Sequence, residues 1–164
     1  MPRGVDAVVV KVMKKFLVAF IVLQVAVVVF CLGPAGPDPI RPDPALTPGA
    51  TLGVGLKQLC TPGYTKTVRN VPAALTAQVY AEYGIKHVPG THEVDHLISL
   101  ELGGSNAITN LWPQTYAPPY GAHQKDNLEN WLHRQVCGGK MPLADAQRDI
   151  ASDWIVAYQK AGLK

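Results

Sequence analysis

The stretch EVDHLISLELGGSNAITNLWPQ, residues 93–114, contains the features that decide the fold of this chain. Its first half is a run of β-leaning apolar residues and predicts an extended segment. The sequence GGSN at 103–106 predicts a turn, because glycine and asparagine tolerate positive φ. A short return strand or loop follows, so a hairpin would gather Asp95, His96 and Asn110. A binding loop, a structural turn and a hydrolytic site are the three interpretations to be separated.

Three segments around the hairpin have apolar residues at helical spacing. The first is capped by Asn70 and ends at Gly84, the second begins near Ala122 and ends before Gly138, and the third runs from Pro142 to Gly162. The order helix, hairpin, helix, helix predicts an α+β domain with a small antiparallel sheet and additional flanking helices.

The N-terminal segment 1–35 has the pattern of an export signal. Its apolar run at 16–32 carries no charged residue, and Lys14 and Lys15 lie directly before that run. A basic flank before an apolar run is typical of a secretory leader or an N-terminal membrane anchor. We expect an exported protein, periplasmic or extracellular, with cleavage after Ala35 favoured over anchoring in the inner membrane through residues 16–32. A buried core helix of a cytosolic protein is the alternative.

Residues 36–55 form a proline-rich segment between this signal and the rest of the chain. Proline lacks a backbone donor and fixes φ, so the segment favours extended structure and predicts a linker. The folded domain is therefore predicted at 56–164. Of the 15 basic and 12 acidic residues of the chain, four basic and one acidic residue lie at 1–35, which leaves equal numbers in the remainder. Net charge thus does not support non-specific nucleic-acid binding by a basic surface.

Cys60 and Cys137 are the only cysteines outside the apolar N-terminal run. In an exported domain two such residues most simply form a disulfide. A bridge across so long a loop would contribute about 4 kcal/mol in the chain-entropy model. Free thiols and metal ligands are the alternatives, although a metal pair more often occurs as a near-neighbour Cys-x-x-Cys motif, which this sequence lacks.

Asp95 and His96 have the side chains that phosphodiester hydrolysis requires. An imidazole with an ordinary pKa of about 6.5 can take a proton from water, and a carboxylate is a hard oxygen ligand for Mg²⁺ or Mn²⁺. Asn110, across the turn, could brace the loop that carries His96. Neighbouring residues on a strand point to opposite faces, so a bend at the strand end is needed for one shared site. Lys66 and Arg69 are candidates for phosphate contacts, with a solvated loop as the alternative.

The sequence VDHLISLELGGSNAITNLWPQ, residues 94–114, resembles the first two-thirds of an HNH endonuclease motif. The flanking sequences CTPGYTKTVRNVP and AHQKDNLENWLHRQVC resemble segments of small exported bacterial HNH-like proteins, so the resemblance covers most of residues 60–160. It implies the ββα-metal fold, in which a hairpin and one helix form the site. It also implies that His96 is the general base, Asp95 a metal ligand and Asn110 the residue that fixes the catalytic loop.

The third element of the HNH family is a metal ligand on the following helix, and here the sequence departs from the family pattern. Asp126 is the first choice because a carboxylate suits a hard cation, His123 is the second and Asn127 the third. The paired Cys-x-x-Cys motifs that hold structural zinc in many family members are also absent. A Cys60–Cys137 bridge would replace that support.

Taken with the resemblance, these features predict an exported, metal-dependent HNH endonuclease. Its substrate would be DNA, with RNA as a further candidate. Its cofactor would be one Mg²⁺ or Mn²⁺ ion, with Zn²⁺ as a further candidate. The sequence indicates no protein partner, and the membrane is a partner only if the leader is uncleaved. The alternative is a non-catalytic exported protein that uses the HNH fold as a nucleic-acid or envelope binding module.

Overall fold

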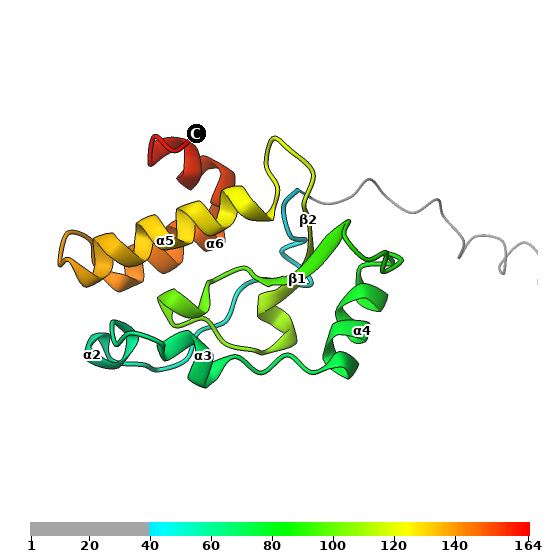
Figure 1. Cartoon of the computed structure of the whole chain (residues 1–164), viewed down its shortest axis with the longest axis horizontal. Coiled ribbons are helices and arrows are strands. Elements are labelled where there is room, and N and C mark those ends of the chain that lie inside the picture. Colours follow the sequence, from blue (N-terminus) through cyan, green and yellow to red (C-terminus); the bar gives the residue numbers. More distant parts are fainter. Residues whose placement is uncertain (1–39) are drawn as a thin grey trace, which may run out of the picture. The chain divides into compact units, whose positions relative to one another are not determined.

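The computed structural model describes residues 40–164 (Figure 1). The predicted leader at 1–35, with its cleavage or anchoring, and the first residues of the predicted linker lie outside the described residues. Within 40–164, none of the helices has the length and apolar character needed to span a bilayer.

The described chain is a mixed α+β fold with one two-stranded antiparallel sheet. In chain order the elements are α2 (Leu56–Leu59), α3 (Tyr64–Val68), α4 (Ala73–Glu82), β1 (His92–His96), the 3-10 helices η1 (Leu100–Leu102) and η2 (Ile108–Asn110), β2 (Leu111–Thr115), α5 (Ala122–Cys137) and α6 (Leu143–Lys160). The α+β class and the order of the three longer helices around a hairpin are confirmed. The short helices α2 and α3 are additions that the sequence patterns do not predict.

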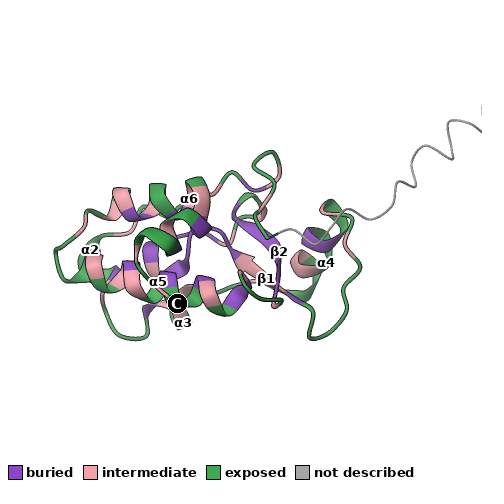
Figure 2. Ribbon diagram, turned by 90° about the horizontal axis from the view of Figure 1, so that it is seen from above, coloured by how far each residue is buried: buried purple, intermediate pink, exposed green. Residues whose placement is uncertain are grey.

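Strands β1 and β2 form the predicted hairpin. His92 lies opposite Thr115, and His96 lies opposite Leu111. β2 is buried along its whole length, whereas the middle of β1 is only half-buried (Figure 2). The hairpin therefore presents the central residues of β1 at the edge of the core, where polar side chains can lie.

The connection between the two strands is longer and more structured than the predicted turn. β1 ends at His96, whereas the sequence predicts extended chain as far as Leu102. That prediction is wrong because the side chain of Asn110 binds both the N–H and the carbonyl of Ile98, at 2.9 and 3.0 Å, so these groups are not available to pair with a strand. Ser99 then caps η1 with its side chain.

The glycines of the predicted turn are required by the geometry of this connection. Gly103 has a φ of 76°, in the left-handed region that favours glycine. A Cβ on Gly104 would lie 1.7 Å from the carbonyl oxygen of Ile98, so no larger residue fits there. The turn at 103–106 is thus present as predicted, within a longer loop.

The predicted helices are present with one shifted start. α4 begins after Pro72, so Asn70 is not its cap, and the backbone N–H of Asn70 instead donates to the side chain of Asn106. α5 begins after Gly121, whose N–H donates to the side chain of Gln124 at 3.1 Å. Glycine has no side chain that could accept in return, so this contact is one half of a capping box, and the N–H of Gln124 donates to the backbone carbonyl of Gly121 at 3.1 Å.

α6 is interrupted at Asp153, which has extended backbone angles (φ −164°, ψ 99°). Its Oδ1 accepts hydrogen bonds from the N–H groups of Ile155 and Val156 at 3.0 and 3.2 Å. Asp153 therefore caps the second half of α6, because a side-chain oxygen satisfies N–H groups that lack a helical partner.

The core lies between α5 and α6, which pack side by side, and η1 (Figure 1). The buried stripe consists of Leu128, Leu132 and Val136 of α5 and Ile150, Trp154, Ile155 and Tyr158 of α6. These residues recur at the helical spacing that the sequence predicts, and Trp131, next to Leu132, is only partly buried. A disulfide joins Cys60, directly after α2, to Cys137 at the end of α5 across 77 residues of sequence.

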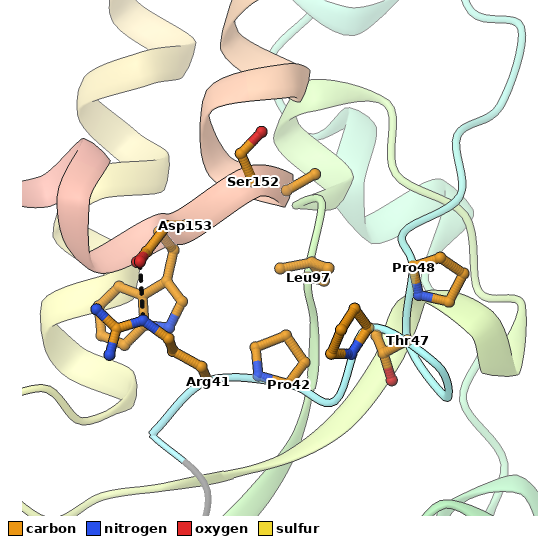
Figure 3. Close-up of a pocket in the computed structure, with 10 residues that line it drawn as sticks. Arg41, Pro42, Thr47, Pro48, Leu97, Ser152 and Asp153 are labelled. Atoms are coloured by element: carbon orange, nitrogen blue, oxygen red, sulfur yellow. Dashed lines mark hydrogen bonds and ion pairs between the residues drawn. The ribbon is translucent and has the colours of Figure 1, made fainter.

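The described part of the proline-rich segment, residues 40–54, lies against the domain, and we call it the strap. The indole N–H of Trp154 donates to the carbonyl of Ile40 at 3.0 Å, and Arg41 forms an ion pair with Asp153 at 2.9 Å. The buried hydroxyl of Thr47 donates to the carbonyl of Leu111 at 2.8 Å. A cavity of about 240 Å³ lies between the strap and α6 (Figure 3). The sequence predicts only a spacer here, whereas the strap makes specific contacts.

Candidate functional site

His96 lies at the end of β1 and is almost fully buried, with 1% of its surface exposed. Its Nε2 is 3.1 Å from Oδ1 of Asn106. Its Nδ1 is also buried and has no hydrogen-bond partner among the described residues. Burial lowers the pKa of His96, an effect that the contacts with Asn106 and Asp95 only partly oppose and that the charges of Arg69 and Lys125 reinforce. The imidazole is therefore neutral at pH 7, with one ring nitrogen unused.

Asn110 holds the loop that follows His96. Its Oδ1 accepts from the N–H of Ile98 at 2.9 Å and from the N–H of Ala50 at 3.3 Å. Its Nδ2 donates to the carbonyls of Ile98 and Ser105 at 3.0 and 2.9 Å. A fully buried amide with four backbone contacts fixes the spacing of the chain segments around it. This is the contact pattern expected of a bracing asparagine.

Asp95 is held by a residue that the sequence analysis did not identify. Nζ of Lys125, on α5, donates to Oδ2 of Asp95 at 2.7 Å and to the backbone carbonyl of His96 at 2.6 Å. It also forms an ion pair with Glu129, one turn further along α5. The contacts with Asp95 and His96 attach the first half of α5 to the end of β1, and the contact with Glu129 lies within α5.

Lys125 is completely buried and remains charged. Burial alone would lower its pKa, but the carboxylates of Asp95 and Glu129 raise it well above its ordinary value. Burial raises the pKa of Glu129 to about 7, against the opposing effect of the Lys125 charge. A sequence signal for Lys125 did exist, since it lies three residues before Leu128 and therefore on the apolar stripe of α5. A lysine at such a position needs buried acidic partners.

The carboxylates of Glu93 and Asp126 lie near Asp95. Burial raises the pKa of Glu93, and the charges of Asp95 and Asp126 raise it further. Burial raises the pKa of Asp126, as does the charge of Asp95. Several acidic groups thus share one region in which the Lys125 ammonium is the buried cation. The carboxylate of Glu93 is also held in place, since its Oε2 accepts a hydrogen bond from the hydroxyl of Tyr116 at 2.9 Å.

His123 lies at the exposed edge of this region. Its Nδ1 is 4.0 Å from Oδ2 of Asp126, and its ring packs against Tyr116 with centroids 5.7 Å apart. The structure therefore brings His123 and Asp126, the two preferred third ligands, beside each other on the first turns of α5. Asn127 is exposed on the same helix.

Arg69 and Lys66 differ in their relation to the site. Arg69 is exposed, and its charge lowers the pKa of both His96 and Asp126, so the guanidinium lies within electrostatic reach of both. Lys66 is exposed on α3, and within residues 40–164 no hydrogen bond or ion pair joins it to the residues described above. Of the two predicted phosphate contacts, only Arg69 lies beside the candidate base.

Among the His, Cys, Asp and Glu side chains of residues 40–164, one group of three has ligand atoms within 4.8 Å of one another, namely Cys60, His133 and Cys137. Its two sulfur atoms are already joined in the disulfide, with His133 Nε2 at 3.2 Å from Cys137 Sγ. Asp95, Asp126 and His123 do not form so tight a group. If they bind a cation, they do so with water or substrate as further ligands.

Comparison of the chain with protein-family models, with curated proteins and with solved structures gives no match. The resemblance to HNH endonucleases therefore rests on the motif residues and stays a prediction.

Proposed function

We propose that this protein is a metal-dependent endonuclease in which β1, β2 and α5 correspond to the ββα-metal unit of HNH enzymes. The observation that carries the proposal is Nδ1 of neutral His96, which lies beside the Asp95 carboxylate and has no hydrogen-bond partner within residues 40–164. Metal-dependent hydrolysis needs a base with a free lone pair, carboxylates that bind a divalent cation, and a loop that holds the base in place. His96, Asp95 with Asp126, and Asn110 are the residues that would supply them.

In the proposed reaction, Nδ1 of His96 accepts a proton from a water molecule whose oxygen attacks the phosphorus atom. A new P–O bond forms, the P–O bond to the leaving group breaks, and the leaving oxygen takes up a proton from solvent. The lowered pKa of His96 supports this role because it keeps the ring neutral at pH 7. Since Nδ1 is covered by neighbouring groups, the reaction requires a side chain to move and admit water.

Asp95 and Asp126 are the residues that we propose hold the divalent cation, with His123 as the second candidate on α5. A bound cation would neutralise charge on the phosphate and on the leaving oxygen. Mg²⁺ is commonly held by one or two carboxylates, while waters and substrate phosphates complete its shell. A pair of acidic residues without a tight third ligand fits that mode, and Mn²⁺ has similar preferences.

The proposed substrate is DNA, with RNA as a second polyanion of the same chemistry. Arg69 would contact a phosphate oxygen, since an exposed guanidinium beside the base can bind phosphate in bidentate fashion. We further propose that the protein acts outside the cytosol. The Cys60–Cys137 disulfide supports this location, because such bonds persist in oxidising compartments.

The decisive experiment incubates the oxidised full chain with supercoiled plasmid DNA and Mg²⁺ or Mn²⁺. We expect nicking that EDTA abolishes, and a loss of about 100-fold or more in His96→Gln, since general-base catalysis typically contributes that much. Lys140→Gln, at an exposed position, is the matched variant and should nick at the wild-type rate. Circular dichroism confirms that each variant is folded.

The absence of nicking from a folded, oxidised sample with either metal would refute the hydrolase proposal. Retained binding of DNA in that sample would instead support the non-catalytic binding module. The covered Nδ1 of His96 is the observation that favours this second function.

A further inference from the structure

Asn106 joins two parts of the proposed site that are distant in sequence. Its Oδ1 lies 3.1 Å from Nε2 of His96 and accepts from the N–H of Asn70 at 3.0 Å. Its Nδ2 donates to the carbonyl of Val68 at 2.7 Å. The side chain is half-buried, so these contacts are only partly exposed to competition from water.

The two backbone contacts determine which way the Asn106 amide faces. The carbonyl of Val68 can only accept and the N–H of Asn70 can only donate, so exchanging the amide oxygen and nitrogen would create two repulsive contacts. Oδ1 therefore faces His96 as an acceptor. The Nε2 atom of neutral His96 must then carry the hydrogen, which leaves the lone pair on Nδ1, the buried atom without a partner in the described chain.

We propose that Asn106 is a positioning residue that fixes His96 as the Nε2–H tautomer and holds Arg69 beside it. Val68 and Asn70 flank Arg69, so the two backbone bonds to Asn106 restrain the turn that carries the guanidinium. One side chain thus sets both the reactive nitrogen of the base and the place of the phosphate contact. The mechanistic meaning of this role rests on the proposed function, whereas the tautomer itself does not.

The tautomer can be measured without any substrate. In ¹⁵N NMR spectra of the full chain at pH 8, we expect the His96 Nε2 to resonate as a protonated, pyrrole-type nitrogen and Nδ1 as a pyridine-type nitrogen. The opposite assignment would overturn the inference. The wild-type spectrum decides this point even if a variant fails to fold.

Two substitutions separate the contact of Asn106 with His96 from its contact with the carbonyl of Val68. Asn106→Asp keeps an acceptor for His96 but loses the donor to Val68, so the tautomer should persist while KM for DNA rises. Asn106→Ala loses all three contacts of the side chain, so we expect mixed tautomers and a kcat lower by on the order of ten-fold or more, within the range that general-base catalysis supplies. Asn70→Ala is the control, because Asn70 contributes its backbone N–H, which the substitution retains.

The outcomes distinguish this inference from the proposed function. An unchanged tautomer in Asn106→Ala contradicts the positioning role, whether or not the wild-type protein cleaves DNA. The expected tautomers in a protein that cleaves nothing support the positioning of His96 and refute only the nuclease.

Discussion

Lys125 is the side chain on which the geometry of the candidate site depends. It neutralises part of the acidic charge and fixes one oxygen of Asp95, which leaves the other oxygen of that carboxylate for a ligand. It also holds the carbonyl of His96 at the point where β1 ends. Removing such a buried charge destabilises the fold, because the carboxylates that it neutralises are then left buried without an opposite charge.

Replacing Lys125 by Met should therefore destabilise the fold strongly. The change removes the cation but leaves Asp95 and Glu129 facing an apolar side chain, for which we expect a loss of about 3–5 kcal/mol in unfolding free energy. Urea denaturation measures this loss, with Lys140→Met at an exposed position as the control. A change below about 1 kcal/mol, the size typical of exposed ion pairs, would show that the contacts are not important for stability.

Arg69 and Lys66 form a matched pair of exposed basic residues near α3. Only Arg69 is within electrostatic reach of His96 and Asp126. We expect Arg69→Ala to raise KM for DNA about ten-fold, the equivalent of roughly 1.4 kcal/mol from one lost phosphate contact, and Lys66→Ala to change it little. Steady-state cleavage assays at fixed salt make the comparison. Equal effects of the two substitutions would place the substrate elsewhere.

At the scale of elements, Asp153 makes α6 two helical segments joined at a bend (Figure 3). Burial would raise its pKa, but the hydrogen bond from Arg41 and the backbone N–H groups of Val156 and Ile155 outweigh burial, and the net pKa is lowered. A carboxyl group whose pKa is lowered in the folded state stabilises the fold at pH values above its ordinary pKa. This contribution is lost as the pH falls through the pKa of the folded state.

Asp153→Asn should consequently narrow the difference in stability between pH 6 and pH 2.5. At pH 6 we expect the variant to lose about 1 kcal/mol of unfolding free energy, a typical value for a weakened helix cap and exposed ion pair, and this loss should be smaller at pH 2.5. Urea midpoints at both pH values test this, and Asp149→Asn on the same helix is the control. A loss of equal size at both pH values would show that the ionised form of Asp153 does not contribute to stability.

At the scale of the whole molecule, the disulfide and the strap join segments that are distant in sequence. Cys60–Cys137 connects α2 to the end of α5, and the strap covers part of α6 and the hairpin loop. In the chain-entropy model, a bridge across 77 residues restricts mainly the unfolded chain.

Reduction of this disulfide should lower the unfolding free energy by about 4 kcal/mol. Thermal or urea denaturation with and without a dithiol reductant measures the change. The double variant Cys60→Ser/Cys137→Ser should match the reduced protein and show no response to the reductant. A stability that the reductant leaves unchanged in the wild-type chain would contradict the prediction.

Local patterns in the sequence determined the α+β class, the three longer helices and the strand pairing around a glycine turn. The number and place of the cysteines predicted the disulfide. They also directed attention to Asp95, His96 and Asn110. These features depend on residues close in sequence, where periodicity, capping and glycine conformation act.

Only the tertiary structure decided the partners of those residues. Lys125 meets Asp95 from a helix 30 residues away, Asn106 joins His96 to the turn of Arg69, and the strap docks on α6 across more than 100 residues. The apolar stripe of α5 marks Lys125 as a lysine that needs acidic partners, but no sequence pattern identifies those partners, because a buried polar group can be satisfied by any segment that folding brings beside it. The physical reason is that burial, unlike helix or turn formation, is a property of the assembled core.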